Sequence, residues 1–359
     1  MQLVGGSSDY DQPKFHFTRD AAAALGARIA LFSRNYNDVI RYANMLLPTP
    51  TQHFALSYTD DTPVLNADGS PAQGVDPNDA ADQFMRSNLH DWRTYIKSGN
   101  PDQMGTDFTS ASANANLLLT ECVTLAYREM VGTAYVRHAM ERTAMVTLLT
   151  ENVTGDPWIF QNVAYQWNGG RTYWLPKFYE DFKIDNPVAQ TGVPYSKCAL
   201  LRLEEVLLAR AEAYAMLGNY DGALDDLNMF AACRIDDYAY GPNTLYKDKL
   251  TDYYTAQLNA PDHFINSAYN AGRFKAGDEG NVQKALILTV LDFRRIEFLY
   301  EGIRYWDVLR WNIPVTHTTI DGATSTLTPD DDRRILQIPQ IATASGIQLN
   351  DMVNIPYPW

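Results

Sequence analysis

The segment from Leu291 to Trp311 constrains the fold more than any other, because its charged side chains recur at helical spacing instead of gathering in a loop. At about 100° per residue, its apolar side chains fall on a second face of the same helix. The segment therefore predicts one amphipathic helix with a seam of charges along one side. The seam contains Arg294, Glu297, Glu301, Arg304, Asp307 and Arg310, and the apolar face contains Phe293, Ile296, Leu299, Ile303, Trp306 and Leu309.

The charged seam has two interpretations. In the first it is structural, because Glu297, Glu301 and Arg304 lie within two helical turns and can pair along the helix. Asp307 and Arg310 turn toward the apolar side, where ionised groups are tolerated only when they are paired. In the second, Glu297 and Glu301 are the general acid and base of a glycoside hydrolase. Neighbouring turns of one helix do not flank a sugar bond, so we predict no catalytic residue and do not expect an enzyme.

The same segment resembles the C-terminal signature of SusD/RagB-like proteins. Such proteins are surface lipoproteins that capture nutrients for an outer-membrane transporter. The resemblance implies a mainly helical fold with tetratricopeptide-like hairpins, long irregular loops and a few short strands. The matching positions are Arg295, Glu297, Glu301, Gly302, Arg304, Asp307, Arg310 and Trp311.

Two segments share a pattern that is typical of a helical hairpin. Thr18 is suited to cap a first helix, and Asn35-Tyr36 interrupts it before a second helix. Asn219-Tyr220 has the equivalent place farther along the chain, after the sequence ARAEAY. We therefore predict tetratricopeptide-like hairpins over residues 18–47 and 197–234.

The remaining segments complete one SusD-like domain over residues 1–359. Residues 48–190 are rich in Asp, Asn, Gly and Pro and predict a loop-rich region with a β-hairpin. Residues 235–290 predict an irregular, aromatic-rich insertion, and residues 291–359 form the signature region. Within the loop-rich region we expect a helix over residues 79–96, a strand over 116–120 and helix over 123–150.

The beginning of the chain has no basic start and apolar core of a secretory signal. Family members carry a lipoprotein signal and an upstream helical region. The resemblance therefore implies that the chain is a fragment of a longer parent. That parent is expected to be lipid-anchored to the cell outer membrane and to face outward.

The formal net charge of -14 disfavours nucleic acid as a partner, because phosphate backbones are repelled. Cys122 lies far from the other two cysteines, and no pair has a zinc or disulfide spacing. Cys198 and Cys233 are expected to be buried in helices. The six histidines are scattered, and the triplet at residues 330–332 predicts a solvated acidic turn, so we expect neither a metal nor a cofactor.

Aromatic residues are the remaining candidates for ligand binding. Alternating aromatics flank Asn168-Gly169-Gly170 and predict a β-hairpin. A ring provides an apolar face for a sugar, and a polar edge meets its hydroxyls. The alternative interpretation is that most of these aromatic residues are core or strand-pairing residues. We nevertheless predict ligand contacts from Trp158, Trp167, Arg171, Tyr173 and Trp174 at the hairpin, with Trp167, Arg171 and Trp174 foremost, and secondarily from Tyr238 and Tyr240.

Three classes of function remain. The first, from the resemblance, is a non-catalytic protein that binds an oligosaccharide or polysaccharide for a SusC-like TonB-dependent transporter, with peptide as an alternative ligand. The second is a helical scaffold that binds another protein, as tetratricopeptide arrays do. The third is a glycosidase, which the lack of a carboxylate pair on separate elements disfavours.

Overall fold

The structure is a computed structural model that describes residues 6–48, 58–59, 62–63, 65–67, 77–92, 101–124, 140–166, 172–319, 322–336 and 338–349. The fold is mainly helical with a few short strands, as expected. Its helices are α1 Arg19–Phe32, α2 Tyr36–Ala43, α3 Pro77–Asn88, α5 Pro101–Phe108, α7 Arg142–Thr150, α8 Leu203–Leu217, α9 Tyr220–Arg234, α10 Lys247–Tyr253, α11 Thr255–Asn259, α12 Gly277–Glu297, α13 Arg304–Trp311 and α14 Gln340–Thr343. Its strands are β1 Tyr58–Thr59, β2 Thr62–Pro63, β3 Asn116–Val123, β4 Tyr165–Gln166, β5 Tyr173–Trp174, β6 Glu180–Asn186, β7 Thr191–Arg202, β8 Val315–Thr318 and β9 Thr324–Leu327.

The first predicted hairpin is confirmed as α1 and α2. The Thr18 side chain accepts a hydrogen bond from the Ala21 N–H at the start of α1, and Asn35 caps α2 in the same way. A Cβ atom added to Gly26 would lie 3.0 Å from the Tyr42 ring, so glycine allows the two helices to approach closely. The second helix ends at Ala43 rather than near residue 47.

The second predicted hairpin is confirmed as α8 and α9. Gly218 ends α8 at a φ of 82°, and the Asn219 side chain accepts a hydrogen bond from the Gly222 N–H at 3.1 Å. The repeated Asn-Tyr pair therefore begins the second helix of both hairpins. The predicted start of the second hairpin at residue 197 is wrong, however, because residues 197–202 belong to β7. Cys198 therefore lies in a strand rather than in a helix.

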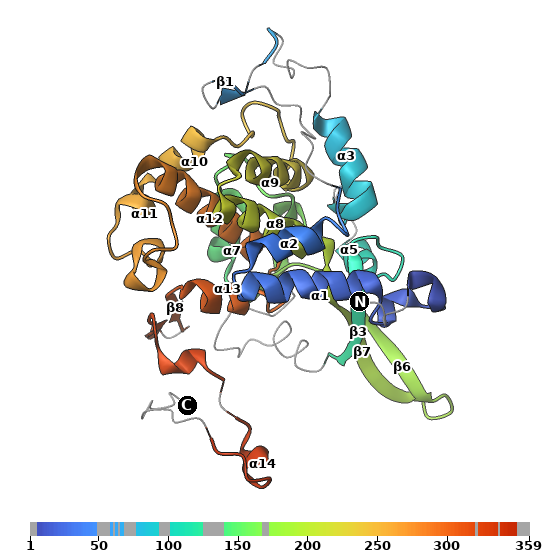
Figure 1. Ribbon diagram of the computed structural model, residues 1–359. Coiled ribbons are helices and arrows are strands. Elements are labelled where there is room, and N and C mark those ends of the chain that lie inside the picture. Colours follow the sequence, from blue (N-terminus) through green and yellow to red (C-terminus); the bar gives the residue numbers. More distant parts are fainter. Residues whose placement is uncertain are drawn as a thin grey trace.

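Helix α8 is the centre of the helical body. Figure 1 shows α1, α2, α8 and α9 lying one above another, and α8 also contacts α12. Leu203 to Ala215 are all buried, which is the pattern of a helix covered on every side. Among the described residues, no helix is both long and apolar enough to span a membrane.

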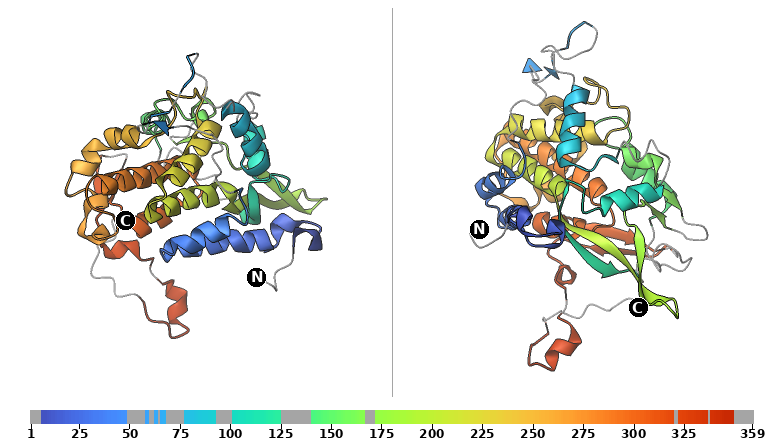
Figure 2. Two further views of the ribbon diagram at one scale, coloured as in Figure 1. Left: turned by 45° about the horizontal axis from the view of Figure 1, so that its top comes forward. Right: turned by 90° about the vertical axis from the view of Figure 1, so that its right-hand side faces the viewer.

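One antiparallel sheet has the strand order β3-β7-β6. The predicted strand at residues 116–120 is confirmed and continues to Val123. Strand β6 pairs with the outer part of β7, from Glu180 opposite Ser196 to Asn186 opposite Thr191, and β3 pairs with β7 as far as Val123 opposite Tyr195. Both views in Figure 2 show this two-stranded ribbon projecting from the helical body.

Two smaller hairpins complete the strands. The predicted aromatic hairpin is confirmed by the pairing of Tyr165 with Trp174 and of Gln166 with Tyr173, while its turn, residues 167–171, lies outside the described residues. Strands β8 and β9 pair from Val315 opposite Leu327 to Thr318 opposite Thr324.

The predicted single helix over residues 291–311 is wrong. Helix α12 ends at Glu297, and α13 begins at Arg304. Tyr300 and Gly302 between them have φ values of 69° and 77°, which a right-handed helix does not contain. The charged periodicity continues across the break, and charged side chains on both sides of it are buried and paired: Glu297 with Arg234, and Arg310 with Glu212.

Several boundaries in less regular segments also differ from the prediction. The insertion over residues 235–290 contains α10 and α11, and from Gly277 it is part of α12 because its apolar side chains pack in the core. Helix α3 ends at Asn88, and α5 occupies a segment predicted as loop. In the segment over residues 123–150, Val123 is strand and the described helix begins at Arg142; residues 125–139 lie outside the description.

Candidate functional site

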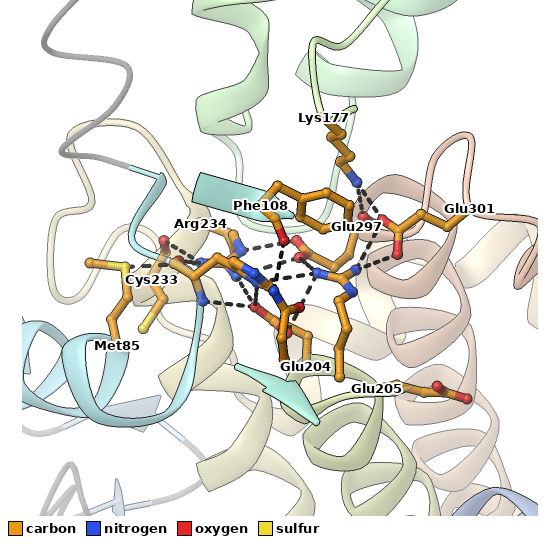
Figure 3. Close-up of polar contacts among 12 residues, drawn as sticks. Met85, Phe108, Lys177, Glu204, Glu205, Cys233, Arg234, Glu297 and Glu301 are labelled. Carbon is orange, nitrogen blue, oxygen red and sulfur yellow. Dashed lines mark hydrogen bonds and ion pairs between the residues drawn. The ribbon is translucent and has the colours of Figure 1, made fainter. Parts of the chain in front are cut away.

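The charged side chains of the signature meet those of other elements inside the molecule (Figure 3). Arg202 ends β7, Glu204 lies in the first turn of α8, and Arg234 ends α9. Each of these side chains is at most 1% exposed. We call the group the buried ionic cluster, and its members are His90, Lys177, Arg202, Glu204, Arg234, Glu297 and Glu301.

Each signature carboxylate in the cluster binds two cations. Arg202 bridges Glu297 at 3.3 Å and Glu301 at 2.8 Å. Arg234 donates from Nε to Glu297 at 2.9 Å, and Lys177 donates from Nζ to Glu301 at 2.8 Å and to the Glu297 carbonyl oxygen. The partners come from a loop, a strand and another helix, so the predicted ion pairs along one helix are wrong in geometry, while the predicted pairing of these charges is correct.

Glu204 binds the opposite side of the cluster. The His90 backbone N–H donates to its Oε1 at 2.8 Å, and the His90 ring Nδ1 lies 2.7 Å from the same oxygen. Burial alone would raise the pKa of the Glu204 carboxyl, but His90, Arg202 and Arg234 hold this pKa well below its usual value. Glu205, the next residue, points away from the cluster in Figure 3 and pairs with Arg28 of α1 at 2.5 Å.

The buried ionic cluster is suited to structure rather than to catalysis. Three carboxylates face two guanidinium groups and one ammonium group, and the His90 ring lies beside Glu204. Burial lowers the pKa of the Lys177 ammonium, against the attraction of Glu301 and Glu297. Because Glu297 and Glu301 are buried and bound to cations, neither is available to a sugar as an acid or base. The cluster ties together segments that are far apart in the sequence.

A second buried network joins α8, α12 and α13. The Arg294 Nε lies 3.0 Å from both carboxylate oxygens of Asp307, and Arg310 donates to Asp307 at 2.9 Å. Arg310 also binds Glu212 of α8 through two nitrogens, at 2.6 and 2.9 Å. Burial would raise the pKa of Asp307, but the arginines lower it below its usual value. The prediction that Asp307 and Arg310 are paired is confirmed.

A cleft of about 1460 Å³ opens on the surface next to these networks. It lies between α7, α10, α11, α13, the end of α12 and the β8–β9 hairpin. Its lining combines apolar, tyrosine and charged side chains, which is the composition expected of a ligand site. The aromatic and charged lining residues are Glu151, Tyr253, Tyr254, Asp292, Arg295, Phe298, Tyr300, Arg304, Tyr305, His317 and Arg333.

Hydrogen bonds orient most of the tyrosines in the cleft. Tyr254 donates to Asp292 at 2.7 Å, and burial, together with this carboxylate, raises the pKa of Tyr254 well above its usual value. Tyr300 donates to the Tyr173 carbonyl oxygen and Tyr305 to that of Arg334, both at 2.5 Å. Tyr253 packs edge-on against Tyr254 and is 45% exposed, so its ring is available to a ligand.

The structure places three of the predicted ligand contacts in the interior. Trp158 is fully buried, Trp174 is 5% exposed beside Tyr165, and Tyr238 is 8% exposed. Burying these large rings stabilises the core, and it leaves little of them for a ligand. Burial also raises the pKa of Tyr238 to about 12.

The other predicted contacts have different places. Tyr173 is partly buried beside the cleft, where its carbonyl oxygen binds Tyr300. Tyr240 is partly buried against the core, and burial raises its pKa to about 12. Trp167 and Arg171 lie outside the described residues.

The sequence interpretation missed most of the cleft. It included Tyr253 only as one of many tyrosines in the insertion, and it used Arg304 only as part of the charged seam. Gly302, two residues after Tyr300, could have indicated a break in the predicted helix.

The acidic triplet near the cleft does not form a metal site. Asp331 pairs with Arg333 at 2.6 Å, and Asp330 accepts a hydrogen bond from the Asn312 side chain at 3.0 Å. In the part of the chain that the structure describes, no group of three His, Cys, Asp or Glu side chains is arranged to hold a metal ion.

Three solved structures from Bacteroides resemble this chain. A protein from Bacteroides vulgatus, named as a candidate sugar-binding protein, is 17% identical with a TM-score of 0.50, over 98% of this chain and 62% of that one. Two SusD superfamily proteins from Bacteroides thetaiotaomicron are 18% and 15% identical, with TM-scores of 0.48 and 0.39. They are matched over 96% and 82% of this chain, which spans 63% and 50% of their lengths.

A search of curated protein sequences gave no match. The model of the SusD family matches residues 49–332, which is most of the chain. The matched range includes the buried ionic cluster and every lining residue of the cleft except Arg333. With that match and the shared fold, the chain belongs to the SusD family.

Proposed function

We propose that this chain is the ligand-binding part of a non-catalytic protein that captures an oligosaccharide or polysaccharide for uptake. The observation that carries the proposal is the cleft, where exposed Tyr253 and other tyrosines lie among charged side chains. A tyrosine ring can pack on the apolar face of a sugar while neighbouring polar groups bind its hydroxyls. Membership of the SusD family and the name of the Bacteroides vulgatus relative support a sugar as the ligand.

The size of the cleft also favours an extended ligand. Its volume of about 1460 Å³ exceeds the roughly 300–1,000 Å³ of sites that enclose one small molecule. We place the ligand across Tyr253 and the start of α13. Tyr173 lies at the base of the aromatic hairpin beside the cleft, so Trp167 and Arg171 of that hairpin remain predicted contacts.

Membership of the SusD family also supports a proposed cellular location and a proposed transporter partner. SusD-family proteins are typically outer-membrane lipoproteins that work with a SusC-like TonB-dependent transporter. We propose that the full-length parent faces outward from the outer membrane and passes its ligand to such a transporter. Protease treatment of intact cells tests this placement: loss of the parent from the cell surface supports it, and complete protection contradicts it.

Screening the purified chain and its full-length parent against a glycan array and a peptide panel tests the proposed ligand class. Binding to glycans alone supports the proposal, and binding to peptides alone replaces sugar with peptide. Failure of both proteins to bind either class contradicts ligand capture. Because Glu297 and Glu301 are buried and paired with cations, we predict that no reducing ends are released from a bound polysaccharide. Turnover that is lost in Glu297→Gln would favour the glycosidase alternative.

A further inference from the structure

Among the described residues, three arginines line the cleft, and two of them are paired with a carboxylate. Arg295 lies 3.3 Å from Asp292, and Arg333 lies 2.6 Å from Asp331. Arg304 donates from Nη1 to the Leu291 carbonyl oxygen at 3.2 Å. Within the described residues it has no carboxylate at ion-pair distance.

The position of Arg304 increases its capacity to bind an anion. It is the first residue of α13, and its neighbours Gly302 and Tyr305 line the same cleft. No side chain caps this helix start, and the Tyr305 and Trp306 N–H groups bond only to the Gly302 and Ile303 carbonyl oxygens. The dipole of α13 adds partial positive charge at this end of the helix. The acidic residue of the first turn, Asp307, is held by Arg294 and Arg310 in the buried network instead.

In the part of the chain that the structure describes, the Arg304 guanidinium makes one hydrogen bond, to the Leu291 carbonyl oxygen. Burial lowers the pKa of Arg304, and the nearby Arg295 and Arg294 lower it further, against the attraction of Asp307 and Asp292. A guanidinium stays charged in proteins and has five N–H donors. One carbonyl oxygen satisfies few of them, and a carboxylate can accept two at once in the planar geometry of an arginine fork.

We propose that Arg304 is the anion-recognising residue of the cleft and that the preferred ligand is an acidic glycan, whose uronate carboxylate binds its guanidinium. This inference rests on the proposed function and names the class of glycan. The formal charge of the chain, -14, provides no long-range attraction for an anion. Selectivity therefore depends on direct contact with Arg304, not on a general positive field.

Calorimetric titration with paired probes tests this inference. The probes are oligosaccharides of galacturonate, glucuronate or mannuronate, each compared with its neutral methyl ester. We expect at least one acid to bind the wild-type chain about ten- to a hundredfold more tightly than its ester, the range for a hydrogen bond to a charged group. Arg304→Gln should remove this preference, so that the acid and its ester bind the variant with equal affinity.

Two further variants make the test specific. Arg304→Lys keeps the charge but loses the two-pronged contact, so it should retain part of the preference. Arg86→Gln removes an exposed arginine of α3 outside the cleft and should bind both probes as the wild type does. Melting temperatures establish that each variant is folded. If Arg304→Gln does not fold, two measurements still test the inference. They are the ratio of acid to ester affinity in the wild type and the same ratio in Arg304→Lys.

Equal affinity of the wild type for acid and ester overturns the inference, as does an Arg304→Gln variant that is folded and keeps the preference. Binding of neutral glycans alone also overturns it. If the wild type binds glycans without preferring the acid, the inference fails but the proposed function stands. If no glycan of any kind binds to the chain or its parent, the proposed function fails as well.

Discussion

Glu301 shows how single side chains hold distant parts of this fold together. It binds Lys177 from the loop before β6 and Arg202 from the end of β7, and its side chain is 4% exposed. Burying an ion pair in the protein interior requires a large desolvation free energy. Removing one member of the pair is strongly destabilising, because the other charge then stays buried without a partner. The pairing of the signature residues is therefore a requirement for folding rather than for binding.

We expect Glu301→Gln to lower the free energy of unfolding by about 3–5 kcal/mol, the range for breaking a buried pair. Urea denaturation measures this change. Glu279→Gln is the matched control, because Glu279 forms an exposed pair with Lys275 and should have only a small effect. Equal effects of the two substitutions would show that the buried ionic cluster does not stabilise the fold.

The lowered pKa values of Glu204 and Asp307 predict a dependence of stability on pH. A carboxyl with a lower pKa in the folded state stabilises the fold above its unfolded pKa, and this stabilisation is lost as the pH falls through the folded pKa. We expect the free energy of unfolding to fall as the pH drops below about 4, the range of unfolded carboxyl pKa values. Denaturation between pH 7 and pH 3 tests this, and Glu204→Gln should show a shallower decline. A wild-type stability that stays constant or rises between pH 5 and pH 3 would contradict it.

Between α12 and α13, the break determines which side chains reach the cleft. Phe298 ends α12 as its C-cap, and the chain then turns through Tyr300 and Gly302 before α13 begins. This turn directs Glu301 to the buried ionic cluster and Tyr300 to the cleft. The signature therefore combines a structural element with part of the candidate site.

Substitutions of Gly302 test the turn. No atom lies within 4 Å of a Cβ added at this position, so only its φ of 77° opposes a side chain. We expect Gly302→Ala to lower the free energy of unfolding by about 1–2 kcal/mol, the cost of a left-handed residue. Gly302→Asn should cost less, because asparagine tolerates this conformation. Equal stability of Gly302→Ala and the wild type would mean that the turn can adopt another path.

Elements with local signals could be predicted from the sequence. Thr18, Asn35 and Asn219 cap helices through hydrogen bonds to residues three positions away, so a short stretch of sequence contains all the information. The break at Gly302 was missed because the apolar and charged spacing continues across it. The burial of Trp158 and Trp174, which were predicted at a ligand site, was missed because burial depends on packing partners that the sequence pattern does not show.

The candidate site is a property of the whole molecule. The cleft combines residues between Met140 and Arg333, and its described walls come from α7, α10, α11, α13, the end of α12 and a hairpin. No local pattern brings Tyr253 near Arg304; the packing of α10 and α12, together with the turn before α13, does so. The family resemblance indicated the class of function, but the location of the site required the three-dimensional arrangement.

Calorimetric titration of Tyr253→Ala with a glycan identified by the array is the most direct test of binding in this cleft. Tyr253 is an exposed tyrosine of the cleft, and Tyr269, which is 40% exposed and lies outside the cleft, provides the matched control. We predict that Tyr253→Ala loses about 1–3 kcal/mol of binding free energy, the range for burying a large apolar side chain, while Tyr269→Ala binds as the wild type does. Unchanged affinity in a folded Tyr253→Ala variant would contradict the placement of the ligand in this cleft.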